Sequence, residues 1–341
     1  MIIQTKKTKP LPLGLAPLKS LRDLQHRLGV KRGILLSLAE NFGDNYDPFR
    51  QPKVTKPHAR VMKPLKFRDI DNPSKTLKAV QDRILDRLLA QVTLPHFLFG
   101  AIRNRCIRSH AREHHGATTV VKMDISSYYP NITNRQIFHV WKNVLLCSPR
   151  LARLLTKLTT YHGHLPQGAP TSPALANILL ASIYSPILQA CENNKVIATA
   201  WVDDLIFSGD QARTVMDIAR GTLAANGLRL SSKKTYILNA RKAKVITGAR
   251  LGKDGLRACK IKLREIRAGI HNLKCGRTTP LGRSRDIQKL RGQIAFINSL
   301  CPSDAIRLAD SLDHLERQTE TQIRRRCPFT IDIPFPPTPA E

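Results

Sequence analysis

Two adjacent carboxylates, Asp203 and Asp204, stand between two apolar, strand-like runs within residues 196–207. A polar pair flanked by β-branched and apolar residues predicts two antiparallel strands joined by a tight turn. The pair would then lie at the tip of a β-hairpin, where two neighbouring anions favour a bound cation. The tetrapeptide Trp201-Val202-Asp203-Asp204 therefore constrains both the fold and the chemistry of the chain.

A third carboxylate, Asp124, lies near the end of another apolar run, residues 120–125. Mg²⁺ is a hard cation that takes oxygen ligands, and carboxylates suit it. We expect three catalytic acids: Asp124 and Asp203 bridging two Mg²⁺ ions about 4 Å apart, and Asp204 at the edge, with the Ile125 carbonyl as a further ligand. Such ions activate a hydroxyl and hold a triphosphate, as nucleotide addition requires. Alone, an Asp-Asp dipeptide is more often a polar turn, so the prediction depends on the motifs around it.

Tyr129 follows Asp124 by five residues, in Ser126-Ser127-Tyr128-Tyr129-Pro130. From this position its ring can pack beneath the sugar of an incoming nucleotide, where a 2′-hydroxyl would clash. The sequence therefore predicts selection of deoxyribonucleotides. An ordinary core aromatic residue is the alternative interpretation.

Gln167 and Gly168 lie in Leu165–Pro173, where a glycine turn leads into a helix opened by Pro173. Backbone N–H groups at the start of a helix favour anionic ligands. We expect this turn and the Gln167 amide to face the nucleotide and the template.

The charge balance is strongly basic, with 56 Lys and Arg against 25 Asp and Glu and a formal net charge of +31. Such an excess is self-repulsive unless a polyanion neutralises it, and solubility alone needs a far smaller net charge. Nucleic acid is the expected partner.

The cysteines and the lengths of the apolar runs indicate the cellular compartment in which we expect the protein. The seven cysteines include no Cys-x-x-Cys pair, which favours reduced thiols and a cytoplasmic protein. Cys106, His110 and His114 have the spacing of one helix face, yet a fourth zinc ligand is not evident. No apolar run reaches the ~18 residues that span a bilayer, so we expect no membrane segment.

Helical and strand patterns are interleaved without regular βαβ units, which favours an α+β fold. Residues 1–60 form an N-terminal extension with a helical stretch around Leu18–Leu28, and an amphipathic helix with Ser74 as its N-cap follows Pro73. A single helix is expected over Pro173–Leu188. Basic helices are expected within residues 260–270 and 287–297, with a third helix capped by Ser303 and ending near Leu315, followed by a Pro-rich tail over residues 328–341.

Several of these motifs resemble bacterial retron reverse transcriptases. The block from Leu165 to Asn177 is similar to one that these enzymes share, and Val202-Asp203-Asp204 to their catalytic hairpin. Residues 68–81 resemble the fingers motif, residues 226–235 the later palm motif, and both Val245-Ile246-Thr247-Gly248 and residues 290–296 the retron-specific segments. The similarity covers roughly residues 60–315.

The resemblance implies a right-hand polymerase: fingers over residues 61–117 and 134–169, a palm with an antiparallel sheet over 118–133 and 170–252, and a basic helical thumb over 253–327. It implies that Arg68 contacts the triphosphate and that Lys234 acts near the pyrophosphate. It also carries over His114 as an RNA contact. The thumb then offers a basic surface to RNA, which includes Lys260, Lys262, Arg264, Arg267, Lys274 and Arg291.

Two positions depart from the family pattern. Trp201 stands where the hairpin usually begins with tyrosine, and His110 stands where the element Asn-Ala-x-x-His normally has asparagine. The bulk of Trp201 is expected to affect placement of the primer terminus. Contacts made by the asparagine are not carried over.

Retron membership implies RNA-directed synthesis, from dNTPs, of branched RNA-linked single-stranded DNA (msDNA) on a structured noncoding RNA. It further implies a role in phage defence with a retron effector protein. Three alternatives are weighed: a group II intron-type reverse transcriptase, for whose extra domains 341 residues leave no room; an RNA-dependent RNA polymerase, which Tyr129 disfavours; and a nucleic-acid-binding scaffold with a degenerate active site.

Overall fold

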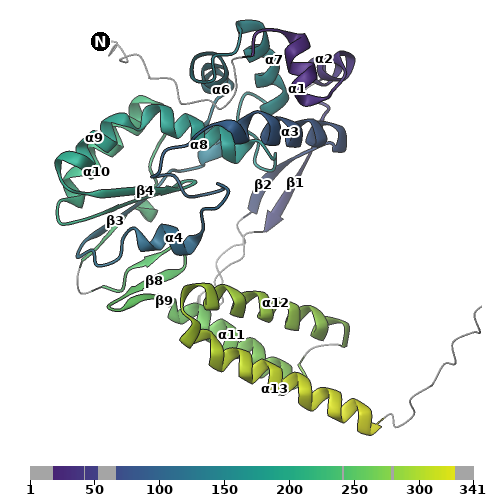
Figure 1. The fold of residues 1–341 in the computed structure, drawn as a ribbon, viewed down its shortest axis with the longest axis vertical. Helices are drawn as coiled ribbons and strands as arrows, with labels where there is room; N and C mark the ends of the chain where they lie inside the picture. The colour runs from purple at the N-terminus through teal and green to yellow at the C-terminus, as the bar shows by residue number, and fades with distance from the viewer. Residues whose placement is uncertain (1–17, 42, 53–66, 240–241, 278–279, 327–341) are drawn as a thin grey trace, which may run out of the picture. The chain divides into compact units, whose positions relative to one another are not determined.

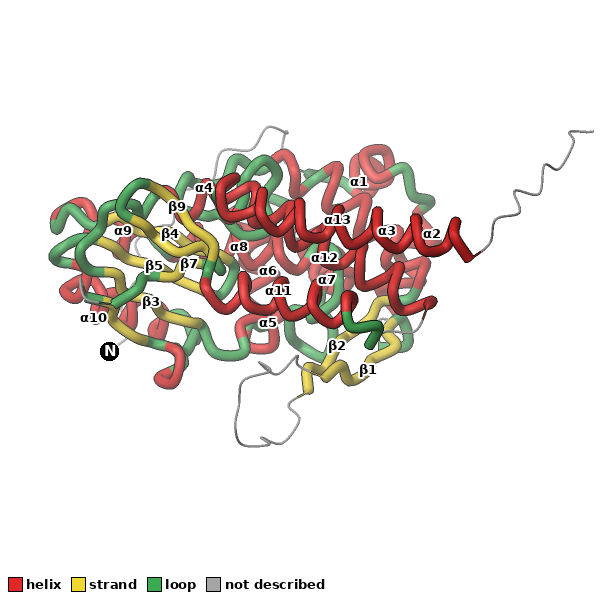
Figure 2. Tube along the Cα trace, turned by 90° about the horizontal axis from the view of Figure 1, so that it is seen from below, coloured by secondary structure: helices red, strands yellow, loops and turns green. Residues whose placement is uncertain are grey.

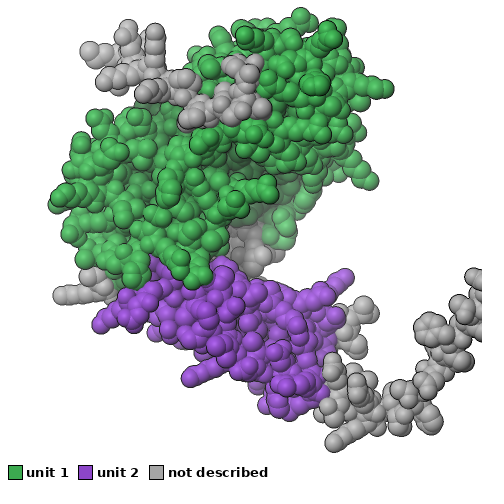
Figure 3. Space-filling view, in the orientation of Figure 1, with its two compact units in different colours: residues 1–244 green, residues 245–341 purple. Residues whose placement is uncertain are grey.

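The structure is a computed structural model that describes residues 18–41, 43–52, 67–239, 242–277 and 280–326. The chain divides into two compact units, residues 1–244 and 245–341 (Figure 3). The expected Pro-rich tail and the first 17 residues of the expected extension lie outside the described residues. The bounds expected for fingers, palm and thumb stay predictions.

An antiparallel sheet of four strands forms the centre of the first unit, in the order β4 (Ile197–Trp201), β5 (Asp204–Ser208), β3 (Val120–Asp124) and β6 (Tyr236–Leu238). The predicted hairpin is therefore present as β4 and β5. Strands β3 and β5 are buried along nearly their whole length, which explains why neither alternates regularly between apolar and polar residues, although the half-buried Lys122 interrupts β3. Helices and antiparallel sheets together give the predicted α+β class (Figure 2).

Helices α8 (Ser172–Ile183), α9 (Ser185–Asn193) and α10 (Ala212–Ala225) pack near this sheet, and α9 and α10 lie side by side (Figure 1). The single helix expected over Pro173–Leu188 is wrong, because α8 and α9 are separate and bent by 58° at Tyr184. Pro186 lies in the first turn of α9, where its missing N–H is tolerated, but inside one continuous helix it would remove a hydrogen bond. Among the described residues, no single helix is long and apolar enough to cross a membrane; only this bent pair reaches that length and composition.

The helix predicted after Pro73 is α3 (Lys75–Arg87), and Ser74 caps it by accepting a hydrogen bond from the Leu77 N–H. Its buried face packs against α1 (Leu21–Leu28), the helix expected near the N-terminus, and against α7 (Pro149–Thr159). The other elements of this unit are α2 (Arg32–Glu40), the antiparallel pair β1 (Tyr46–Pro52) and β2 (Phe67–Pro73), η1 (Leu89–Gln91), α4 (Ile107–Arg112), α5 (Tyr128–Asn131), α6 (Asn134–His139), η2 (Val140–Val144) and η3 (Ser232–Lys234).

The second unit begins with a small antiparallel sheet, β7 (Val245–Ile246), β8 (Ala249–Gly252) and β9 (Gly255–Ala258). Thr247 and Gly248 join β7 to β8 with φ angles of 47° and 92°, the left-handed backbone that a tight hairpin requires. Helices α11 (Lys260–Lys274), α12 (Pro280–Leu300) and α13 (Pro302–Arg326) follow and share one apolar core. Helix α13 begins at Pro302, so Ser303 lies in its first turn instead of capping it, and the helix extends well past Leu315.

Candidate active site

The three predicted acids lie at one end of the central sheet. Asp124 is the last residue of β3 and pairs in register with Asp204, the first residue of β5. Asp203 lies in the turn before Asp204, and its carbonyl accepts a hydrogen bond from the Ile125 N–H at 2.8 Å. Residues separated by about 80 positions are therefore brought together by strand pairing alone.

Two lysines compensate this negative charge. The Lys122 ammonium lies 2.7 Å from Oδ2 of Asp204, and the Lys234 ammonium lies 2.8 Å from Oδ2 and 3.0 Å from Oδ1 of Asp124. The hydrogen bond to Asp124 raises the pKa of Lys234, so this side chain stays protonated at neutral pH. Among the described residues, Asp203 has no ion-pair partner. Burial raises the pKa of Asp203, and the neighbouring carboxylates of Asp204 and Asp124 raise it further.

The donor set suits a hard divalent cation. Within the part of the chain that the structure describes, no group of three or more His, Cys, Asp or Glu side chains is already arranged around a common point as a metal site. Burial, and after it the charges of Asp204 and Asp124, nevertheless raise the pKa of Asp203, and a divalent cation would stabilise its charged form. The carboxylate oxygens of Asp124 already form an ion pair with one cation, the Lys234 ammonium. The chemistry of these side chains therefore fits Mg²⁺.

A cavity of about 470 Å³ opens beside Asp124 and Asp203. Strand β2, α5, the turn before α8 and η3 all contribute to its wall, although they are far apart in sequence. Asp204 is not part of that wall. The cavity brings together five residues predicted to bind nucleotide, namely Arg68, Ile125, Tyr129, Gln167 and Lys234.

Gly168 and Gln167 fasten the turn before α8 to strand β2. The Asp71 N–H donates to the Gln167 carbonyl at 2.9 Å, and the Gln167 N–H donates to Oδ2 of Asp71 at 3.0 Å. His164 lies 3.2 Å from the same carboxylate. Gly168 has a φ of 142°, and a Cβ on it would lie 2.9 Å from the Asp71 carbonyl oxygen, so glycine is required here. Asp71 was not predicted as a site residue. Its only signal in the sequence is that acidic residues alternate after Arg68, at positions 69 and 71.

The two tyrosines after Asp124 occupy different environments. Tyr128 is buried and its hydroxyl donates to the Ala176 carbonyl at 2.9 Å, although it also contributes to the cavity wall. Tyr129 lines the cavity, and burial followed by the charge of Asp203 raises its pKa to about 12. Its hydroxyl therefore stays neutral beside the acids.

Comparison with known proteins agrees with this geometry. Residues 54–267 match the family model described as reverse transcriptase (RNA-dependent DNA polymerase). The chain is 30% identical over 256 residues to the retron Ec86 reverse transcriptase of Escherichia coli, covering 74% of this chain and 78% of that protein. The chain belongs to the retron reverse transcriptases. The enzyme is therefore an RNA-directed DNA polymerase, as predicted.

Two further relatives are more distant. The retron Se72 reverse transcriptase of Salmonella heidelberg (strain 579083-10) is 26% identical over 66% of this chain and 59% of its own. The retron Mx162 reverse transcriptase of Myxococcus xanthus is 27% identical over 73% of this chain and 58% of its own. The enzyme thus spans less than two thirds of the length of these two relatives.

His110 and His114 of the retron enzyme are buried instead of facing RNA or solvent. Nδ1 of His114 lies 2.7 Å from the Ser208 hydroxyl, and its Nε2 lies 2.6 Å from the Thr199 hydroxyl. Burial lowers the pKa of His114 to about 4 and that of His110 to about 3, so both rings are neutral at physiological pH. A side chain without exposed surface has no face to present to RNA, so the direct contact expected for His114 is replaced by a structural role.

The basic residues of α11 and α12 differ in how their charge is compensated. Arg291 lies 2.7 Å from Glu316 and 3.6 Å from Asp313, and Lys262 lies 3.4 Å from Glu265. Lys260, Arg264, Arg267 and Lys274 have no carboxylate within ion-pair distance among the described residues.

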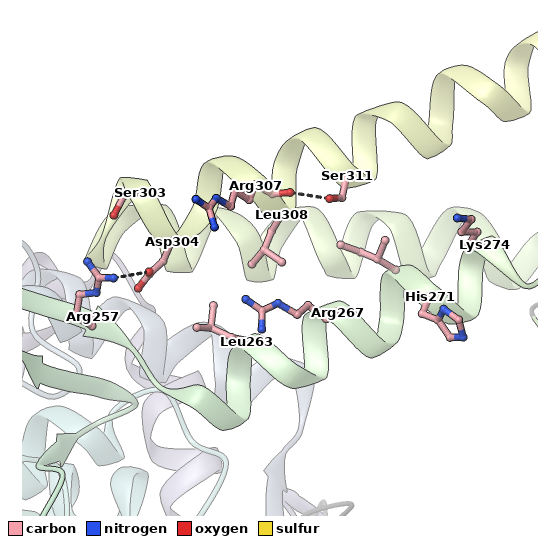
Figure 4. Close-up of a pocket in the computed structure, with 11 residues that line it drawn as sticks. Arg257, Leu263, Arg267, His271, Lys274, Ser303, Asp304, Arg307, Leu308 and Ser311 are labelled. Carbon is pink, nitrogen blue, oxygen red and sulfur yellow. Dashed lines mark hydrogen bonds and ion pairs between the residues drawn. The ribbon is translucent and has the colours of Figure 1, made fainter.

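A cavity of about 590 Å³ lies between α11 and α13 (Figure 4). Its single acid, Asp304, is paired with Arg257 at 3.1 Å. The cavity wall therefore contains three further cations, Arg267 and Lys274 from α11 and Arg307 from α13. No unpaired carboxylate in this wall compensates their charge. Arg257 and Arg307 were missed because neither belongs to the basic helices predicted from the sequence.

Proposed function

We propose that the enzyme reverse transcribes a structured noncoding RNA into RNA-linked single-stranded DNA (msDNA), by nucleotidyl transfer assisted by two Mg²⁺ ions. The observation that carries the proposal is the cavity in which Asp124 and Asp203 face Arg68, Gln167 and Tyr129. Membership in the retron family supplies the substrate class.

Asp124 and Asp203, with the Ile125 carbonyl, are the groups that we assign to the two ions, and Asp204 supports them from the edge. When bound, the ions supply a lowered pKa for the attacking hydroxyl and charge neutralisation at the triphosphate. The Lys234 ammonium, which touches Asp124, lies where it can face the leaving pyrophosphate. The contact with Asp124 raises the pKa of Lys234, so the side chain is positively charged before a nucleotide binds.

The walls of the cavity position the nucleotide. Arg68 on β2 offers a guanidinium to the triphosphate, because planar N–H groups match phosphate oxygens. The turn at Gln167 and Gly168, which is fastened to β2, orients the base and the template. Tyr129 fills the space under the sugar and excludes a 2′-hydroxyl.

The uncompensated cations of the second unit bind the phosphates of the RNA or of the RNA–DNA hybrid. A-form helices are recognised through shape and phosphates, and neutralising phosphates releases counterions. Lys260, Arg264, Arg267 and Lys274 are the predicted contacts that have the charge available for this role. By family membership we extend the proposal to phage defence together with an effector protein.

The test is to purify the protein from its native locus and to sequence the nucleic acid that remains bound. DNA joined to RNA through a branch supports the proposal, and unmodified RNA alone contradicts it. The Asp203→Asn variant should keep its RNA and lose the DNA. A wild-type protein that binds RNA but incorporates no deoxynucleotide with Mg²⁺ would instead support the scaffold alternative.

A further inference from the structure

The turn that carries Asp203 contains an unfavourable backbone conformation. Val202 has a φ of 58°, which lies in the left-handed region. A β-branched residue rarely adopts it, because its side chain crowds the backbone there. Such conformations persist where the surrounding structure holds them, and they often occur at functional sites. The neighbours of Val202 should therefore explain how the turn is held.

The first neighbour is the segment Phe97–Gly100, which covers the outer edge of β4. The Phe99 N–H donates to the Ala200 carbonyl at 2.7 Å, and the Ala200 N–H donates to the Phe97 carbonyl at 2.8 Å. The segment ends at Gly100 directly against the turn: a Cβ on Gly100 would lie 2.5 Å from the Val202 nitrogen and 2.6 Å from its Cγ2. No side chain fits between Gly100 and the turn.

Gly100 is itself fixed from another direction. The buried Asn177 amide on α8 donates to the Gly100 carbonyl at 2.9 Å. Helix α8 begins just after the turn at Gln167 and Gly168, so the helix that follows this turn also holds Gly100. Gly100 is thus a backbone spacer between α8 and the turn that carries Asp203.

The second neighbour is His110 on α4. Its ring stacks on Trp201, with centroids 5.4 Å apart and planes 28° apart, and it also contacts the Phe99 ring at 5.0 Å. Nε2 of His110 lies 2.8 Å from the Thr199 hydroxyl. Thr199 and Trp201 are two residues apart on β4 and so project from the same face of the sheet. One imidazole therefore holds two consecutive side chains of that face.

His110 and Trp201 are also the two positions at which this chain departs from the family pattern, with histidine for asparagine and tryptophan for tyrosine. They lie 91 positions apart in sequence and stack directly. The larger tryptophan ring on the hairpin is therefore contacted by the imidazole of His110, at the position where the family pattern has the amide of an asparagine.

We propose that Gly100 and His110 are positioning residues that hold the Val202–Asp203 turn and thereby set the place of the Asp203 carboxylate, with His110 and Trp201 acting as a matched pair. Gly100 acts through direct contact with Val202, and His110 acts through Trp201. The inference rests on the proposed catalytic role of Asp203.

The first experiment compares Gly100→Ala with Gly221→Ala in deoxynucleotide incorporation. Gly221 lies inside α10, and a Cβ on it would meet no heavy atom within 4 Å, so it controls for the added methyl group. A Cβ on Gly100 must push the turn by nearly 1 Å to reach an ordinary contact, and a displacement of that size lowers kcat about 100-fold. We expect this loss with little change in the KM for dNTP or in RNA affinity. Full kcat in Gly100→Ala would overturn the inference.

The second experiment is a double-mutant cycle that installs the family residues: His110→Asn, Trp201→Tyr and both together. We expect each single variant to lower kcat at least about tenfold and the double variant to recover most of that loss, because the pair is coupled. Losses that simply multiply in the double variant would show independent sites and overturn the pairing. If Gly100→Ala does not fold, as judged by its thermal transition, the cycle decides alone.

Asp203→Asn is measured in the same assay to separate the two levels of the argument. An inactive Asp203→Asn beside a fully active Gly100→Ala overturns the positioning inference only. An Asp203→Asn variant with the wild-type rate overturns the proposed role of Asp203, and the positioning inference with it.

Discussion

Replacing Lys122 by methionine should destabilise the first unit. The change keeps most of the side-chain volume but leaves the Asp204 carboxylate without the ammonium that now lies 2.7 Å away. Removing one partner of a fully buried ion pair costs about 3–5 kcal/mol, because the remaining charge stays buried and uncompensated. Lys122 and Asp204 are 18% and 20% exposed, so solvent screening reduces our expectation to about 2 kcal/mol. For a unit of this size, that loss lowers Tm by about 4–8 °C.

Tryptophan fluorescence is a suitable measurement for this prediction. The sequence has two tryptophans, Trp141 and Trp201, and both lie in the first unit, so the thermal transition followed at their emission reports on that unit. Arg220→Met is the matched control, because it breaks an ion pair with Asp217 whose side chains are 54% and 75% exposed. Exposed pairs contribute less than about 1 kcal/mol, so its Tm should change little.

The double variant Lys122→Met/Asp204→Asn tests the physical reason. Because the loss comes from an uncompensated carboxylate rather than from the absent ammonium, removing both charges should return Tm most of the way to the wild-type value. A Lys122→Met transition within 1 °C or so of wild type would refute the reasoning. So would a double variant no more stable than the single one.

Three further outcomes are expected. The pKa of Asp203 is raised in the folded state, so its charge destabilises the fold at neutral pH. Without Mg²⁺, Asp203→Asn should therefore raise Tm near pH 7. This gain in Tm should vanish as pH falls into the ordinary carboxyl range, where Asp203 is protonated in both states. Gly168→Ala should raise the KM for dNTP, whereas Gly116→Ala, with φ of 79° but open space around it, should not. Arg267→Ala should lower RNA affinity and reduce the salt slope by about one; Arg291→Ala, whose charge is already paired, should do less in the same titration.

Local patterns allowed the elements that carry the acids to be predicted. The hairpin at Asp203 and the strand ending at Asp124 each follow from a short apolar run with a polar end, and strand pairing then brings them together. The cap at Ser74 is equally local. The break at Tyr184 was missed, although Pro186 marked it, because apolar residues continue on both sides of that proline.

The environment of a side chain could not be predicted in the same way. Only His110 lies on the short helix α4, because the helix ends at Arg112 and His114 lies in the turn that follows. Their partners Thr199 and Ser208 come from strands 85–94 positions away. The sequence gives no sign that these hydroxyls would satisfy buried imidazoles. A motif shared with a family identifies a position, and only the fold decides whether that position is exposed to RNA.

The two lysines beside the acids differ in their exposure to solvent, and this difference indicates which acids can exchange a lysine for a metal ion. Lys122, largely buried, is a permanent partner of Asp204, whereas Lys234 is 64% exposed and can leave Asp124, which is 7% exposed, when a stronger cation arrives. This difference supports our proposal that Asp124 and Asp203 are the acids available to Mg²⁺ and that Asp204 supports them from the edge. We expect Asp124→Asn and Asp203→Asn to reduce incorporation to background. Asp204→Asn should retain measurable activity, lowered about 10–100-fold as for a group that orients metal ligands. Single-turnover rates at saturating Mg²⁺ and dNTP decide the ranking, and equal losses in all three variants would contradict it.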